Sequence, residues 1–287
     1  MDLLIKQDSY EVKLSQLGIY NINIDDSSPS IEIDRRTVKG RSGYIHDGVT
    51  LRQKKIKVTG RLAVAGLQAF MEKKDDLIGL LCGDAPYYVT KMYPDQDDLY
   101  SFELPGTKTG DLNLLTIPHT AWKYRYKVNL NNEIEFSFIG KSEQGLKYNL
   151  AFELVTAEMP FGETIPKDIV LSGGMIPYAG TAAFSQLEVP YTVELTSSAS
   201  QTSFFLEIDG RRWTYNHSAT PIQEGEKLLL TGVESRIYKG IALPDLNINA
   251  RTNYEYFVIK PNPLKQVRYS TNFRGTVKVL GFKELYK

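Results

Sequence analysis

The chain has 287 residues, with 34 basic and 34 acidic side chains, so its formal net charge is zero. That balance argues against a protein held mainly on nucleic acid or anionic lipid, because such proteins carry a basic excess. Hydrophobic residues make up 42% of the chain and aromatic residues 11%, which is enough to fill cores and excludes a disordered protein. A single cysteine excludes an internal disulfide framework and a cysteine-cluster metal site.

Alternation of apolar and polar residues predicts strands along most of the first half. Acidic residues, serines and a proline at 25–29 predict a turn between the first two strands. Asn131, Asn132 and Glu133 predict the tip of a hairpin between the strands at 123–130 and 134–139. The strand segments are 19–24, 31–33, 55–64, 123–130 and 134–139.

One helix is predicted in the first half, at about residues 66–82. Its apolar residues recur at helical spacing, and Gly83 stands where a glycine commonly ends a helix. Cys82 lies at the end of this apolar face and is predicted to be a small buried side chain. The apolar residues are Leu67, Phe70, Met71, Leu77, Ile78 and Leu81.

A glycine-rich polar segment at 140–145 predicts a boundary between two domains, residues 1–143 and 144–287. Short strands with turn residues between them follow, and this spacing favours a β-sandwich. The predicted strands are 148–154, 169–171, 191–195, 204–208, 227–230, 254–259 and 275–280. The fold class is therefore mainly β, with one helix in the N-terminal half.

No motif carries catalytic or cofactor chemistry. Ser42 lacks the glycine spacing of a hydrolase nucleophile, and His46, His119 and His217 lack the spacing of a helical zinc pair. Neither a phosphate-binding loop nor a dinucleotide glycine signature is present. We therefore expect no enzyme activity, no catalytic residue, no cofactor and no metal site.

The N-terminus also lacks the basic start and the apolar run of a secretory signal, and no stretch is apolar enough to span a membrane. We expect a protein made in the cytoplasm and left there, or released only when the cell lyses.

Charge is segregated within the first half. Nine basic residues between Arg35 and Arg61 stand against one acid, Asp47, whereas acids cluster at 75–76 and at 95–98. Such segregation in a neutral chain suits contacts between copies of the chain. A basic face that only meets solvent explains it equally well, and both interpretations stay open here. A nucleic-acid surface is disfavoured, because Tyr44 alone offers little base stacking.

Several segments together resemble a known family, the distal tail (Dit) proteins of long-tailed siphophages that infect Gram-positive bacteria. The first half resembles the family's N-terminal domain, and the second half resembles its galectin-like C-terminal domain. The segments that carry the resemblance are Gly40-Arg41-Ser42-Gly43-Tyr44-Ile45-His46-Asp47-Gly48, Lys55-Ile56-Lys57-Val58-Thr59-Gly60, the helix through Leu81, and residues 228–240.

The resemblance implies a split-barrel-like N-terminal β domain that forms a ring and a galectin-like C-terminal β-sandwich. It implies a structural virion protein, a hub of the distal tail or baseplate. A hexameric ring, alone or back to back with a second, would join the tail tube to the tail-tip fibre or lysin and carry receptor-binding proteins. The partners would be further copies of the chain, the major tail protein, the fibre or lysin protein and receptor-binding proteins, with no membrane and no sequence-specific nucleic acid.

By position, the resemblance also implies an arm that grips the neighbouring subunit, with glycines allowing its bends. The candidate interface residues are Arg36, Gly40, Arg41, Gly43, Tyr44, Asp47, Gly48 and Arg52.

The alternative function is a carbohydrate-binding protein that contacts the host cell wall through the C-terminal β-sandwich. Trp213 and Tyr215 are its candidate glycan contacts, because exposed aromatic rings can stack on sugars. Aromatic residues at alternate strand positions also occur in cores and interfaces, so the pattern does not decide between these roles.

Overall fold

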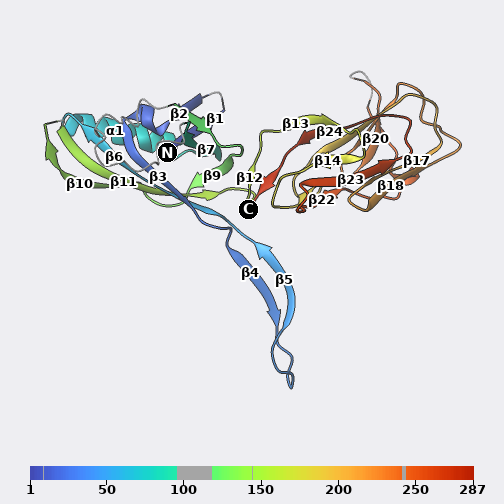
Figure 1. The fold of residues 1–287 in the computed structure, drawn as a ribbon, viewed down its shortest axis with the longest axis horizontal. Coiled ribbons are helices and arrows are strands. Elements are labelled where there is room, and N and C mark those ends of the chain that lie inside the picture. The colour runs from blue at the N-terminus through green and yellow to red at the C-terminus, as the bar shows by residue number, and fades with distance from the viewer. Residues whose placement is uncertain (9, 96–117, 144, 241–243) are drawn as a thin grey trace, which may run out of the picture. The chain divides into compact units, whose positions relative to one another are not determined.

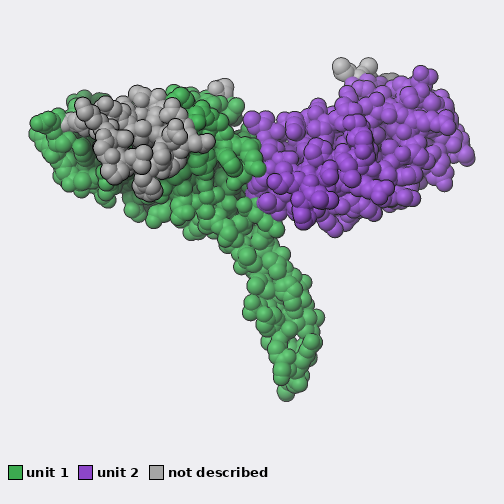
Figure 2. All heavy atoms as spheres, in the orientation of Figure 1, with its two compact units in different colours: residues 1–162, 287 green, residues 163–286 purple. Residues whose placement is uncertain are grey.

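A computed structural model describes residues 1–8, 10–95, 118–143, 145–240 and 244–287. The chain divides into two compact units, Met1–Gly162 with Lys287 and Glu163–Tyr286 (Figures 1 and 2). Both units are built mainly of strands, and α1 (Leu67–Leu81) is the one α-helix in the described part of the chain. The predicted fold class, mainly β with one helix in the N-terminal half, is confirmed.

Unit 1 contains a large antiparallel sheet. Its strands are β1 (Asp2–Gln7), β2 (Tyr10–Lys13), β3 (Ile19–Asp26), β6 (Lys55–Val64), β7 (Tyr87–Pro94), β8 (His119–Ala121), β9 (Tyr126–Leu130), β10 (Glu135–Ser142) and β11 (Gly145–Thr156). They are hydrogen-bonded in the order β2-β1-β7-β9-β11-β6-β3, with β10 also beside β11 and β8 beside β7. The sheet thus pairs strands that are far apart in the sequence, such as β11 with β6 and β1 with β7.

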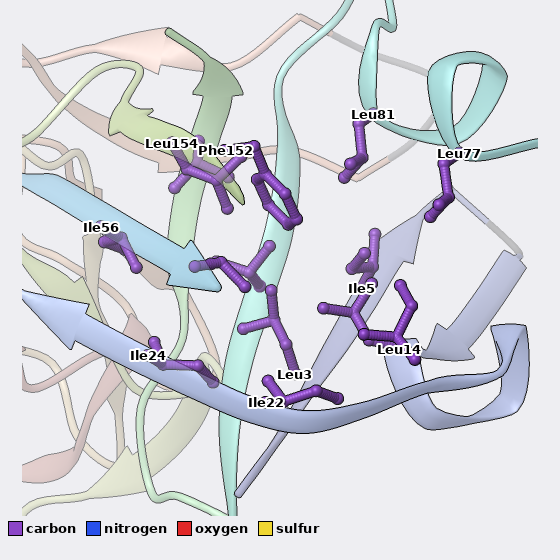
Figure 3. Close-up of a cluster of buried hydrophobic side chains, with 14 of the residues drawn as sticks. Leu3, Ile5, Leu14, Ile22, Ile24, Ile56, Leu77, Leu81, Phe152 and Leu154 are labelled. Carbon is purple, nitrogen blue, oxygen red and sulfur yellow. The ribbon is translucent and has the colours of Figure 1, made fainter. Parts of the chain in front are cut away.

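The main core of unit 1 lies between α1 and the sheet. Leu77 and Leu81 of the helix are buried with Leu14 of a short 3-10 helix (Leu14–Leu17) and with strand residues such as Ile5 (Figure 3). Burying each such side chain stabilises the fold by about 1.5–3 kcal/mol. Of the rest of the predicted apolar stripe, Phe70 is partly buried and stacks on Tyr148, whereas Leu67, Met71 and Ile78 are exposed.

Two expectations at the end of the helix were wrong. Cys82 is exposed rather than buried, and it occupies the C-cap position with a negative φ of −92°. Gly83 therefore does not form the expected glycine cap. The helix ends on Leu81, whose side chain is 1% exposed, and the chain turns outward immediately afterwards.

The predicted hairpin around Asn131–Glu133 is also wrong, because β9 and β10 do not pair with each other. Both pair with the long strand β11, β9 near its end and β10 along its first part. The asparagines separate β9 from β10 without reversing the direction of the chain. The Asn131 amide donates to the Glu153 carbonyl at 2.8 Å, and the Asn132 side-chain oxygen accepts from the Glu153 amide at 2.8 Å.

The boundary between the compact units lies at Gly162/Glu163, not at 143/144. The glycine-rich segment that predicted a boundary is instead the turn of the β10–β11 hairpin, where Ser142 is opposite Gly145. Strand β11 then pairs with β6 from Leu146 to Val155. A domain that ended at residue 143 would lose the central strand of its own sheet.

Unit 2 is a β-sandwich of two antiparallel sheets. Their orders are β13-β24-β16-β19-β20-β21 and β14-β23-β17-β18, and two short pairs, β12–β25 and β15–β22, accompany them. The strands are β12 (Gly162–Glu163), β13 (Lys167–Val170), β14 (Met175–Pro177), β15 (Phe184–Ser185), β16 (Thr192–Ser197), β17 (Ser203–Ile208), β18 (Arg211–Asn216), β19 (Lys227–Leu230), β20 (Ser235–Tyr238), β21 (Leu246–Asn247), β22 (Val258–Ile259), β23 (Gln266–Thr271), β24 (Gly275–Phe282) and β25 (Leu285–Tyr286).

Of the predicted strand at 254–259, only the last two residues form a strand, β22. Tyr254 adopts a left-handed conformation with φ of 57°, which a strand does not accommodate. The Phe257 amide donates to the Gln186 side-chain oxygen at 2.8 Å instead of to a neighbouring strand. The Phe257 carbonyl still accepts from the Gln186 amide at 3.1 Å, so one glutamine holds both backbone groups of Phe257 where the strand begins.

Replacing Gly145 with alanine should lower the free energy of unfolding by at least about 2 kcal/mol. Gly145 has φ of +106°, and an added Cβ would lie 2.1 Å from the backbone oxygen of Val64. Urea unfolding followed by circular dichroism measures the change. Gly79→Ala is the matched control, because nothing lies within 4 Å of the added atom and alanine favours the helix by about 1 kcal/mol. Equal stability of Gly145→Ala and the unmodified protein would contradict this account of the turn.

Candidate functional site: a projecting hairpin

A two-stranded hairpin projects from the sheet of unit 1 (Figure 1). Its strands, β4 (Ile31–Arg36) and β5 (Ile45–Leu51), pair with each other and with no other strand in the described part of the chain. Figure 2 shows it as a narrow extension of unit 1. We call residues 31–52 the arm.

The arm continues the pairing of two sheet strands. In the sheet, Asp26 of β3 is opposite Ile56 of β6, and the same number of residues further along both strands Ile31 is opposite Leu51. Between these pairs, the Ser27 amide donates to the Lys55 carbonyl at 3.0 Å. The turn predicted at 25–29 is therefore wrong, because the chain does not reverse there and runs on into the arm.

The two faces of the arm differ in chemistry. Successive residues of a strand point to opposite faces, so Ile31 and Ile33 share a face with their partners Leu51 and Val49. On this apolar face, Ile31 is 62% exposed, Ile33 41% and Val49 53%. The opposite face carries charge. Its members include Glu32, Asp34, Thr50 and Arg52, and Arg52 pairs with Glu32 at 2.5 Å.

The tip of the arm is basic and is shaped by glycine. Gly40 and Gly43 have φ of +83° and +82°, a left-handed conformation that glycine adopts without strain. The Arg35 guanidinium lies 4.4 Å from the centre of the Tyr44 ring. Lys39 and Arg41 are exposed, and neither forms an ion pair within the described residues. The tip therefore presents several positive charges to solvent.

The structure brings the predicted arm residues together on this hairpin. Arg36 pairs with Asp47 at 3.5 Å, and Asp47 lies at an irregularity where Asp34 is opposite Gly48 and Arg35 is opposite His46. Gly48 does not adopt a left-handed conformation, so the bend expected of it is made at Gly40 and Gly43 instead. The remaining predicted residues are Arg41, Tyr44 and Arg52, at the tip and at the end of β5.

Sequence reasoning missed the apolar face of the arm. The signal was present, because Ile31 and Ile33 alternate with acids and Val49 and Leu51 alternate with Thr50. In a strand of a packed sheet this alternation marks a core face. Here the same pattern belongs to a hairpin with no core beneath it.

A buried charge cluster anchors the base of the arm. The Asp26 carboxylate pairs with Lys91 and with Lys54, whose ammonium lies 3.3 Å from Oδ2, and it accepts a hydrogen bond from the Tyr126 hydroxyl at 3.2 Å. The Lys54 side chain is only 4% exposed, and its ammonium also lies 5.0 Å from the centre of the Tyr126 ring. One carboxylate therefore neutralises two largely buried lysines where β3 leaves the sheet.

The environment of Asp26 favours its charged form. Burial acts to raise the pKa of this carboxyl, but the hydrogen bond and charge of Lys91 and the charge of Lys54 outweigh it and hold the pKa below its usual value. Burial raises the pKa of Tyr126 far above its usual range, so the phenol stays protonated and donates to Asp26.

The predicted glycan contacts lie in the core of unit 2. Trp213 and Tyr215 are both 0% exposed. The Trp213 indole donates to the Ser235 hydroxyl at 3.1 Å, which links the two sheets, and the Tyr215 ring stacks on Phe204 with centroids 5.2 Å apart. The hypothesis that these two rings stack on sugars is therefore wrong, because neither is accessible.

Two further observations concern metals and membranes. Within the described residues, no three His, Cys, Asp or Glu side chains gather closely enough to hold a metal ion. Asp97 and Asp98 of the predicted acidic cluster lie outside the described residues. In the same part of the chain, no helix has the length and apolar character needed to cross a membrane.

Comparison with solved structures shows what this fold is similar to. The chain is similar to the crystal structure of the SPP1 Dit protein (gp 19.1), described as a paradigm of the hub adsorption apparatus in phages that infect Gram-positive bacteria. The TM-score is 0.62 at 14% sequence identity, over 99% of this chain and 99% of that chain. The chain has the fold of SPP1 Dit. The mainly β fold expected from the sequence resemblance is confirmed for the described residues.

Two structures of the phage p2 baseplate in its activated conformation, one with Sr and one with Ca, are also similar. Their TM-scores are 0.35 and 0.36, at 9% and 8% identity, over 99% of this chain and 97% of those chains. At these scores the similarity is too low to compare individual elements. No protein-family model and no curated protein sequence matches the chain.

Replacing Asp26 with asparagine should lower the free energy of unfolding by about 3 kcal/mol, because it leaves Lys54 and Lys91 largely buried without a counter-charge. Asp25→Asn is the matched control, since Asp25 is exposed and adjacent. Urea unfolding of both variants at neutral pH measures the difference. An Asp26→Asn variant as stable as Asp25→Asn would contradict the anchoring role of the cluster.

The same variant has an expected pH dependence. Because the folded pKa of Asp26 is lowered, its stabilisation is present above the ordinary pKa of an aspartate and is lost as the pH falls through the folded pKa. The stability difference between the unmodified protein and Asp26→Asn should therefore shrink as the solution is acidified. A difference that stayed constant down to pH values below the folded pKa would show that the charge of Asp26 is not its source.

Proposed function

We propose that this protein is a structural component of a phage tail, a hub at the distal end or baseplate, that assembles as a hexameric ring. The observation that carries the proposal is the similarity to SPP1 Dit over 99% of both chains. Similarity at 14% identity concerns the fold, so the function rests on this fold together with the chemistry of the arm.

The arm supports assembly through contacts between copies. An isolated two-stranded hairpin is only marginally stable in water, and three strands or a packed partner are normally needed. This arm nevertheless exposes Ile31, Ile33 and Val49. Covering these side chains with a neighbouring copy would remove apolar surface from water and stabilise the hairpin together with the assembly. In a ring, the arm of each copy contacts the next copy and not the one that grips it, which is a heterologous interface, and such an interface closes a ring when the rotation between neighbours divides the full turn.

In this proposal unit 1 builds the ring, and the galectin-like β-sandwich of unit 2 serves as a platform. The partners are the major tail protein on one side, the tail-tip fibre or lysin on the other, and receptor-binding proteins carried by the platform. The protein acts in the virion at the tail tip and has no catalytic role. The buried positions of Trp213 and Tyr215 remove the residues on which the carbohydrate-binding alternative depended.

Removing the arm should abolish the ring and leave the fold of unit 1 intact. The Arg52 amide donates to the Ser30 carbonyl at 2.9 Å, so the ends of the excised segment are adjacent. Residues 31–51 can therefore be replaced by Asn-Gly, a pair that closes a tight hairpin. We expect the intact protein to show six-fold rings in negative-stain images at high concentration or beside its tail partners. The armless variant should remain monomeric by light scattering, with a similar unfolding temperature.

Two outcomes would contradict the proposal at different points. An intact protein that stayed strictly monomeric at high concentration, and formed no ring beside its tail partners, would overturn the assembly function. Rings formed equally well by the armless variant would leave the hub function standing and remove the arm from the interface.

A further inference from the structure

Strand β10 forms an open edge of the sheet of unit 1. Within the described residues it pairs with β11 on one side and with no strand on the other. Phe138 of this edge is 60% exposed, although its ring lies 5.4 Å from the ring of the buried Tyr148. The Phe70 ring of α1 stacks on Tyr148, so Phe138 lies on the face of the sheet that carries the helix. An edge of eight residues with an exposed aromatic ring is a template for one more strand.

The other sheet edges of the described chain are shorter, polar or covered. The edge strands β2, β8, β13, β14 and β21 have four residues or fewer. Strand β3 exposes only polar side chains. Along β18, the Asn253 side chain accepts from the Thr214 amide at 2.9 Å and donates to the Arg212 carbonyl at 2.7 Å. Apart from the arm, β10 is therefore the long edge of the described chain with an uncovered apolar side chain.

Strand β4 of the arm has the pattern that this edge requires. All six of its residues are exposed, and β5 is its only strand partner within the described residues. Residues 31–34 alternate between isoleucine and an acid, and residues 135–138, the regular part of β10 before its irregularity, alternate between a polar residue and phenylalanine. Side by side, the two strands can place their apolar side chains on one face and their polar side chains on the other.

The charges of the two strands select one antiparallel register. When Ile33 lies opposite Phe138, Arg36 lies opposite Glu135, and these two charges attract each other. A shift by two residues would place Asp34 opposite Glu135, and like charges directly opposite each other destabilise a strand pair. A shift by two in the other direction would remove Ile33 from Phe138.

Both charges of this register are available to a neighbouring copy. Glu135 forms no ion pair within the described residues. Arg36 pairs with Asp47 at 3.5 Å, but its side chain is 66% exposed. A guanidinium has five N–H donors, so Arg36 can bind a second carboxylate without leaving the first.

The tip of the arm favours the same direction. In the antiparallel arrangement the chain beyond Arg36 runs past the start of β10, where Glu133 is exposed and forms no ion pair within the described residues. The positive charges of Lys39 and Arg41 are then close to this acid. A parallel arrangement would carry the tip towards Lys141 at the other end of β10, where the like charges repel.

We propose that β4 of the arm of one copy adds to β10 of a neighbouring copy as a further antiparallel strand, with Ile33 opposite Phe138. This inference rests on the proposed ring, and it names the edge that receives the arm. Main-chain hydrogen bonds hold the added strand, and the side chains fix its register. Val38 and Tyr44 of the tip lie outside the paired strands. The receiving β10 belongs to another copy, because the arm stands clear of β10 in its own chain (Figure 1).

A disulfide between copies tests the register. In the Cys82→Ser chain, Asp34→Cys with Ser137→Cys places two thiols opposite each other, at a separation that a disulfide can bridge. Oxidation should give a ladder of linked chains larger than dimers. Asp34→Cys with Glu135→Cys is the matched control on the same strands, and it should give at least 10-fold less of the ladder because its thiols are two residues out of register.

The single variants test whether like strands pair instead. In the Cys82→Ser chain, Asp34→Cys alone and Ser137→Cys alone should each give no linked product. Dimers from Asp34→Cys alone would show that two arms pair with each other, and dimers from Ser137→Cys alone would show the same for two β10 strands. Either dimer as the main product would overturn the proposed pairing.

Hydrogen exchange gives a second measurement, which needs no introduced thiol. Amides at an open sheet edge exchange readily, and an added strand protects them. Residues 135–142 should therefore exchange at least 10-fold more slowly in the ring than in the armless variant. The exposed edge of β3 should show no such difference.

A charge placed at the edge should prevent the pairing. Phe138→Lys puts a cation where the apolar contact is expected, which is a device that natural edge strands use against further pairing. It should weaken self-association at least 10-fold in sedimentation velocity and leave the unfolding temperature nearly unchanged. Ile165→Lys is the matched control, because Ile165 is 72% exposed in unit 2, and it should have little effect.

The outcomes separate this inference from the proposed function. Rings that form normally, without protection of residues 135–142 and without the ladder from Asp34→Cys with Ser137→Cys, would overturn the pairing on β10 and leave the hub intact. Absence of rings from the unmodified protein, even at high concentration and beside its tail partners, would overturn the proposed function itself. Protection of β10 together with the register-dependent ladder would establish the contact.

Discussion

The charge cluster at Asp26 is the constraint on which the described architecture of unit 1 depends. It lies where β3 and β6 stop being members of a sheet and continue as two strands with nothing packed on either side. Asp26 ends β3, Lys54 directly precedes β6, and Lys91 lies in β7. The two ion pairs of Asp26 therefore connect three segments that are far apart in the sequence. The desolvation of these charges is costly unless all are satisfied, and this makes the geometry specific. The arm leaves the sheet from this fixed point.

Beyond Asp26, the stability of the arm depends on what covers its exposed apolar side chains. Within the sheet, apolar side chains of β3 and β6 are covered by the core, and in the arm residues with the same alternation are open to solvent. In the proposed ring, a neighbouring copy would cover this surface of a hairpin that has no core of its own. The zero net charge of the chain fits contacts between copies, because a basic arm and acidic surfaces of different copies can attract each other. A chain with no net charge also does not bind polyanions through an overall basic excess.

Unit 2 shows the opposite use of aromatic residues. Phe204, Trp213 and Tyr215 fill the space between two sheets, and the polar atoms of the Trp and Tyr side chains find partners inside the unit. From the sequence alone, alternating aromatic residues in a strand can be either buried or exposed. Both faces of a strand accept large rings, and the position of the second sheet decides which face is buried.

The sequence by itself determined the local character of the chain: strands where apolar and polar residues alternate, one helix at 67–81 within a residue or two, and a basic segment with glycines at its bend. These features depend on neighbours within a few residues, which the sequence displays. It did not indicate β1 or β7, whose apolar runs lack a clear alternation, and it also missed β2, although Tyr10 and Val12 alternate there with charged residues. Only the tertiary structure decided which strands pair. It placed β9 and β10 along β11 instead of against each other, moved the boundary between units to 162/163, and gathered Asp26, Lys54, Lys91 and Tyr126 from distant positions. Pairing across long separations depends on which apolar faces are covered together, and that is a property of the whole sheet.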